Sequence, residues 1–112
     1  MKLGEMECIP CRGDQPRLDQ AEIEKYLRQV EDWQVITLDD IQRLTRHYKF
    51  KNYARAFAFA NAVGELAEEQ NHHPAILIEW GQVTVSWWTH VIGGLHKNDF
   101  ISAAKTDQIY QG

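Results

Sequence analysis

Four of the five histidines in this 112-residue chain lie between residues 72 and 96. Imidazole is the one side chain that changes charge near neutral pH without perturbation, so this concentration predicts proton transfer. His72 and His73 stand directly before Pro74, where a helix must stop, so both rings project from a short turn. The negative end of a helix favours imidazolium, and Glu68, one turn before His72, adds to this effect. One histidine can then act as an acid while its neighbour acts as a base.

Other interpretations of these histidines stay open from the residues alone. His72 and His73 could be solvent-exposed residues beside a helix stop, and His90 could be a strand histidine bonded to the backbone. A zinc site with His90 and Glu68 as further ligands is disfavoured, because adjacent histidines rarely point at one ion. Neither HxxH nor HExxH spacing occurs.

Three tryptophans accompany the histidines, at positions 80, 87 and 88. They could line a slot for a flat heterocycle, although packing in the core or at an interface is the more common role of a tryptophan. On a strand that runs to His90, Trp88 shares a face with His90, and Trp87 shares the other face with Thr89.

Three helices are predicted to position these residues. Asp19 is a suitable N-cap with Glu22 in capping-box position, so a first helix begins there and ends before Trp33. A second helix follows Asn52 and ends near Asn71. Its apolar stripe is Tyr53, Ala56, Phe57, Ala60, Val63 and Ala67. A third helix is predicted over residues 99–110.

Two β-hairpins are predicted between the helices. Residues 33–38 and 41–50 are rich in β-formers and flank Asp39-Asp40, while residues 75–80 and 83–90 flank Gly81-Gln82. The order is therefore αββαββα. It predicts an α+β single domain in which a four-stranded antiparallel sheet carries its helices on one face.

Composition excludes several classes of protein. Twelve Lys and Arg against sixteen Asp and Glu give a net charge of −4 without a basic stripe, so we expect no direct nucleic-acid ligand. Uncharged apolar stretches such as residues 74–78 are far too short to span a bilayer, and no cationic start with an apolar h-region occurs. We therefore expect a cytoplasmic protein without a membrane anchor.

Residues 1–17 are predicted to form an extended or loosely attached arm, because they contain glycine and proline without periodicity. The domain proper is expected to span residues 18–112. Cys8 and Cys11 form a single CxxC in the arm. A disulfide-stapled secreted domain would normally carry more cysteines, so an inert pair or metal binding with another subunit remain the alternatives.

The spacing Glu68-x3-His72-His73-Pro74-x5-Trp80-x9-His90-x8-Asp99 closely resembles the signature of the pterin-4a-carbinolamine dehydratase family. The match is specific because several fixed gaps must hold together, and the resemblance extends over residues 18–110. It implies an αββαββα fold and homodimers or homotetramers. One departure is Asn98, which stands where several relatives have arginine; the hydroxyl that usually caps the last helix is also absent.

The resemblance implies dehydration of 4a-hydroxytetrahydrobiopterin to the quinonoid dihydropterin, without a metal or an organic cofactor. This reaction recycles the pterin of aromatic amino-acid hydroxylation. The family pattern assigns catalysis to His72, His73 and His90, and we expect substrate contacts from Glu68, Trp80, Thr89 and Asp99. Our hypothesis is that His72 and His90 are acid and base, while His73 orients the pterin. The alternative is a non-enzymatic module that oligomerises with a transcription factor, a role known in this family.

Overall fold

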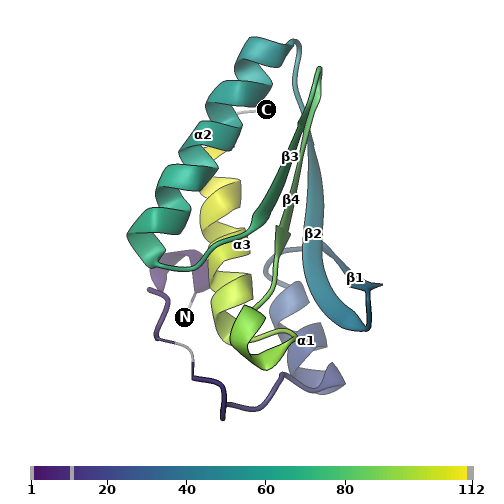
Figure 1. Cartoon of the computed structure of the whole chain (residues 1–112), viewed down its shortest axis with the longest axis vertical. Helices are drawn as coiled ribbons and strands as arrows, with labels where there is room; N and C mark the ends of the chain where they lie inside the picture. The colour runs from purple at the N-terminus through teal and green to yellow at the C-terminus, as the bar shows by residue number, and fades with distance from the viewer. Residues whose placement is uncertain (1, 11, 111–112) are drawn as a thin grey trace.

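The computed structural model describes residues 2–10 and 12–110, and it confirms the αββαββα order in one α+β domain (Figure 1). The helices are α1 (Gln20–Leu27), α2 (Tyr53–Gln70) and α3 (Lys97–Ile109). The strands are β1 (Gln34–Leu38), β2 (Ile41–Lys49), β3 (Ala75–Glu79) and β4 (Gln82–Trp87). Two short 3-10 helices, η1 (Leu3–Glu5) and η2 (His90–Ile92), complete the described elements.

The four strands form one antiparallel sheet in the order β1-β2-β4-β3. The two predicted hairpins are therefore joined in the middle of the sheet by the pairing of β2 with β4. In that pairing Leu44 lies opposite Trp87, and Tyr48 lies opposite Val83. These four side chains are buried under the helices, and α2 and α3 lie side by side against this face (Figure 1).

The apolar stripe of α2 differs from the prediction at its aromatic residues. Ala56, Ala60, Val63 and Ala67 are buried as expected, but Tyr53 and Phe57 are about half exposed, and Phe59 is buried in their place. Phe59 packs in an aromatic cluster whose other members include Tyr48, Phe50 and Tyr110. Long-range aromatic packing of this kind leaves no local spacing signal, which explains the difference.

Strand β4 ends earlier than predicted, at Trp87. Thr89 then pairs with Gly94 in an isolated bridge that encloses η2, and Gly93 adopts a left-handed conformation with φ 61°. His90 therefore lies on a 3-10 turn beyond the strand. Of the roles considered for Trp87, the structure places it in the core, where its indole N–H donates to Thr106.

The N-terminal arm contacts the domain at more points than the sequence indicated. Leu3 is 1% exposed in the core, and its backbone N–H donates to Gln29. Arg17, the last residue of the arm, donates to the Ile92 carbonyl, and the N–H of the adjoining Leu18 donates to the Leu95 carbonyl. No helix within residues 2–10 and 12–110 has the length and apolar character needed to cross a bilayer.

Candidate active site

The C-terminal end of α2 directs two adjacent histidines to different environments. Asn71 adopts a left-handed conformation with φ 52°, and the His72 N–H donates back to the Ala67 carbonyl. This turn stops the helix just before Pro74, as predicted. His72 is turned inward and is 8% exposed, whereas the His73 side chain is 53% exposed.

His72 forms a buried pair with Asp99 from the first turn of α3. Its Nε2 lies 2.6 Å from Asp99 Oδ1, while Asp99 Oδ2 accepts from the Thr89 hydroxyl and the His96 N–H, both at 2.9 Å. Because these partners donate to Asp99, the carboxylate is the acceptor and His72 Nε2 carries a proton. The other ring nitrogen of His72, Nδ1, is left to exchange a proton with a ligand.

The orientation of the His72 ring is fixed by a second contact. The ring stacks on Trp87 with an interplanar angle of 11° and a centroid separation of 5.6 Å. Trp87 and Asp99 are both fully buried. A histidine held by a buried carboxylate and a buried aromatic face is preorganised for acid or base chemistry at a fixed position.

The other two predicted catalytic histidines are more exposed. His73 Nε2 lies 2.5 Å from Glu68 Oε2, which pairs residues one turn apart at the end of α2. His90 packs its ring against Trp88 at a centroid separation of 4.6 Å, and the Arg43 guanidinium lies 4.2 Å from the Trp88 ring centre. The surface beside His90 is therefore partly aromatic.

A recess of about 280 Å³ brings the three histidines together. Its lining consists of Ile9, Pro10, Asn71, His72, His73, Thr89, His90, Val91 and Asn98. Glu68 and Asp99 do not line the recess, but each holds one of its histidines. Six of the seven residues predicted for the site therefore lie in or directly behind one recess.

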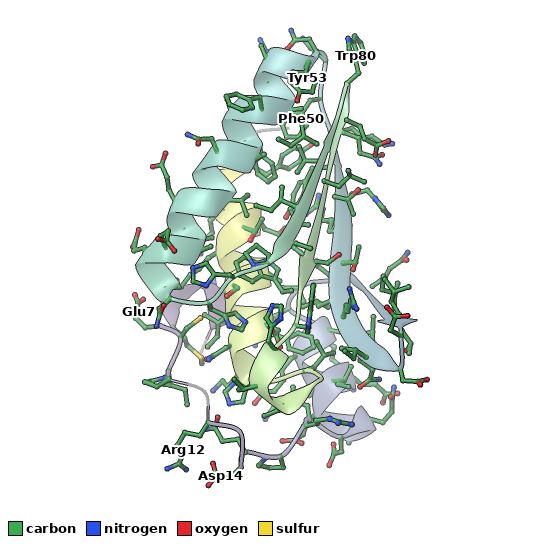
Figure 2. The ribbon with its side chains drawn as sticks, in the orientation of Figure 1. Glu7, Arg12, Asp14, Phe50, Tyr53 and Trp80 are labelled. Atoms are coloured by element: carbon green, nitrogen blue, oxygen red, sulfur yellow. The ribbon has the colours of Figure 1, made fainter. Side chains whose placement is uncertain are left out.

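Trp80 is the predicted site residue that the structure does not bring to this group. It lies in the turn between β3 and β4, is 70% exposed, and occupies the opposite end of the sheet (Figure 2). His73 precedes β3 and His90 follows β4, and the two strands are antiparallel. The intervening hairpin is about 15 Å long, so Trp80 does not reach the recess of its own chain.

Sequence reasoning missed several lining residues that come from distant segments. Ile9 and Pro10 belong to the arm, and Val91 lies on η2. No periodicity marks these positions.

Acidic, cysteine and histidine side chains do not gather as a metal-ligand set in the part of the chain that the structure describes. Within residues 2–10 and 12–110, no group of three or more lies close enough together to hold an ion. The donors at the recess are instead used in pairs, with His72 bonded to Asp99 and His73 bonded to Glu68. The arrangement provides imidazoles for proton transfer and hydrogen bonding.

His96 takes the place of the missing hydroxyl cap of α3. Its Nδ1 accepts from the Asn98 N–H at 3.0 Å, and Asp99 accepts from the His96 N–H, which completes a capping box. Burial lowers the pKa of His96 from its usual 6.5, with His72 and Lys97 adding to this effect and Asp99 opposing it. Only neutral imidazole can accept the Asn98 N–H, so the cap is lost when His96 is protonated.

We expect His96→Ala to lower the free energy of unfolding by about 1 kcal/mol and His96→Ser to restore most of it. Because the folded-state pKa lies below the unfolded value, the unfolded state binds more protons as the pH falls below 6.5. The wild type should lose stability in that range relative to His96→Ser. Urea unfolding at pH ~7.5 and ~5.5 checks both effects. A wild-type to serine difference that does not change with pH would contradict the capping role.

Known proteins resemble this chain in sequence and in fold. The sequence profile of the family described as pterin 4 alpha carbinolamine dehydratase matches residues 16–109. A provisionally named pterin-4-alpha-carbinolamine dehydratase of Marinobacter nauticus is 54% identical over 108 residues, covering 96% of this chain and 97% of the relative. A protein of Nitrosococcus oceani with the same provisional name is 56% identical over 107 residues, covering 96% and 95%.

Solved structures share the fold. The crystal structure of a transcriptional coactivator/pterin dehydratase from Brucella melitensis has a TM-score of 0.75 and 32% identity, covering 84% of this chain and 98% of that chain. A pterin dehydratase-like protein described as a RuBisCO assembly factor in the alpha-carboxysome has a TM-score of 0.57 and 23% identity, covering 69% and 87%. This second likeness concerns the fold alone. With the profile spanning residues 16–109 and relatives above 50% identity, the chain belongs to the pterin 4 alpha carbinolamine dehydratase family.

Proposed function

We propose that this chain dehydrates 4a-hydroxytetrahydrobiopterin, or a closely related 4a-hydroxytetrahydropterin, to the quinonoid dihydropterin. The observation that carries the proposal is the recess in which His72, His73 and His90 meet, with His72 oriented by Asp99. The family membership and the dehydratase names of the relatives support the same reaction.

The proposed reaction needs two proton movements. One proton goes to the C4a hydroxyl, the C4a–O bond breaks as water leaves, and a ring nitrogen loses a proton to a base. We assign the acid and base roles to His72 and His90, which project into the recess from different elements. His73, held by Glu68, would bind and orient the pterin. The base role requires a neutral imidazole, and the acid role requires a protonated one.

A rate measurement tests this proposal against the alternative of a non-enzymatic binding module. The 4a-hydroxytetrahydropterin is generated in a stopped-flow instrument, and the appearance of the quinonoid product is followed by absorbance. A dehydratase raises the first-order rate in proportion to protein concentration, whereas a binding module leaves the spontaneous rate unchanged. Mass spectrometry of the product establishes which pterin is formed.

We also propose that the chain forms a homodimer or homotetramer. Four large apolar or aromatic side chains on α2, on the edge strand β3 and in its turn are about half exposed or more: Tyr53, Phe57, Leu77 and Trp80. We infer that a partner subunit covers these side chains and the unpaired edge of β3. Sedimentation at micromolar concentration should give a dimer or tetramer, and Phe57→Glu or Leu77→Glu should shift it toward monomer. A wild-type monomer would contradict this proposal.

A further inference from the structure

The N-terminal arm forms part of the wall of the catalytic recess. Ile9 and Pro10 line it together with residues more than sixty positions away in the sequence, such as His72. Figure 1 shows the arm passing the end of α2 and the start of α3 before it reaches α1. A segment without regular structure can occupy this place only if side chains of the domain hold its backbone.

Asn98 provides that attachment. Its Oδ1 accepts from the Ile9 N–H at 3.0 Å, and its Nδ2 donates to the Ile9 carbonyl at 2.6 Å. Both backbone groups of one arm residue are therefore bonded to a single amide. Asn98 is 1% exposed and directly precedes Asp99, so the first turn of α3 holds both the arm and the catalytic dyad.

A second attachment lies one residue earlier in the arm. The Cys8 N–H donates to Gln70 Oε1 at 3.0 Å, and Cys8 Sγ lies 3.4 Å from Ser102 Oγ. Gln70 is the last residue of α2, and Ser102 lies on α3. The arm is thus bonded to the last residue of α2, two positions before His72, and to α3, which carries Asp99, and these bonds fix its position relative to both side chains.

We propose that Ile9 and Pro10 form a fixed apolar wall for the flat pterin ring, and that Asn98 is the positioning residue for this wall. The inference rests on the proposed function and names what determines the affinity of the same site. Ile9 and Val91 are apolar side chains that remain more than half exposed at the recess, so a bound ring would cover them. Covering apolar surface favours binding.

The wall should affect binding and not proton transfer, because neither Ile9 nor Pro10 has a titratable side chain. The amide of Asn98 carries one acceptor and two donors, so it can bond both the N–H and the carbonyl of Ile9.

The test compares Ile9→Ala and Asn98→Ala with Asp14→Ala, an exposed arm position that does not line the recess. Binding of biopterin is measured by quenching of tryptophan fluorescence, and turnover is measured in parallel. We expect Kd and KM to rise about three- to tenfold in Ile9→Ala and Asn98→Ala. We expect kcat of Ile9→Ala and all constants of Asp14→Ala to stay within about twofold of wild type.

Hydrogen exchange tests the positioning role of Asn98 independently of the affinity for biopterin. In Asn98→Ala the backbone amide at position 9 should exchange faster. In Ile9→Ala the backbone amide at the same position should stay protected by Asn98. Because Asn98 is buried, Asn98→Asp provides a second variant that retains the acceptor for the Ile9 N–H. An unchanged Ile9 exchange rate in Asn98→Ala would overturn the positioning role.

The outcomes separate this inference from the proposed function. If biopterin binding depends on Ile9 but the wild type does not accelerate dehydration, the binding role of Ile9 and Pro10 is supported and the proposed dehydratase activity is refuted. If the wild type accelerates dehydration but Ile9→Ala leaves Kd and KM unchanged, the binding role of Ile9 and Pro10 is refuted. Absence of biopterin binding by the wild type would also refute the binding role of Ile9 and Pro10.

Discussion

Alanine at His72 or at His90 is expected to lower kcat for pterin dehydration by about 100-fold, the lower range for loss of a general acid or base. His72 is held between Asp99 and Trp87, so its free ring nitrogen has a fixed direction. His90 reaches the recess from η2 and rests on Trp88. If the two imidazoles act on different protons of one elimination, loss of either removes most of the rate. Stopped-flow turnover at saturating substrate measures both variants.

His47→Ala is the matched control for this experiment. His47 is the one histidine outside residues 72–96; it is exposed on β2 and bonds to Thr84 on β4. The kcat of His47→Ala should equal that of the wild type. Because His72 is buried, His72→Gln serves as a second variant that keeps an amide N–H for Asp99 but cannot transfer protons. Rates within a factor of two of wild type in His72→Ala and His90→Ala would refute the acid and base roles.

Asp107→Ala is expected to lower the free energy of unfolding by about 3 kcal/mol, because it removes the common partner of three buried or half-buried donors. Asp107 accepts from the Trp33 indole N–H at 3.0 Å and from the Tyr48 hydroxyl, and it pairs with Arg46 at 2.7 Å. Burial, followed by the bond to Asp107, raises the pKa of Tyr48. The tyrosine therefore stays a neutral donor that needs this acceptor.

Asp32→Ala provides the comparison for Asp107→Ala, since both carboxylates face the same nitrogen of Arg46. Asp32 lies 3.6 Å away and its side chain is 75% exposed. Exposed pairs contribute little, so this variant should lose less than about 1 kcal/mol. Thermal unfolding should give a Tm about 10 °C or more lower for Asp107→Ala and nearly unchanged for Asp32→Ala. Equal losses in the two variants would contradict the role of Asp107 as the buried acceptor.

Local signals predicted most of the fold. The capping box of Asp19 and Glu22 and the helix stop before Pro74 each act within a few residues, and both are present. The turn at Asp39-Asp40 is equally local; both residues have positive φ, which suits a two-residue hairpin. What local signals did not predict depends on distant packing, as in the burial of Phe59 in place of Phe57.

The candidate site shows the same division between local and distant information. The fixed gaps of the family signature identified His72, His73 and His90, which the fold gathers at one recess. The signature could not place Trp80, because a spacing along the chain does not tell which end of a hairpin a residue occupies. Nor could it find Ile9, whose contact with Asn98 joins positions 89 residues apart.

One stopped-flow comparison tests whether the histidines of this recess catalyse pterin dehydration. Wild type and the His72→Ala/His90→Ala double variant are mixed at equal concentration with freshly formed 4a-hydroxytetrahydropterin, beside a protein-free sample. We predict a rate that rises linearly with wild-type concentration, and a double variant within about twofold of the spontaneous rate. A wild-type rate equal to the protein-free rate, or a double variant as fast as wild type, would contradict catalysis by these histidines.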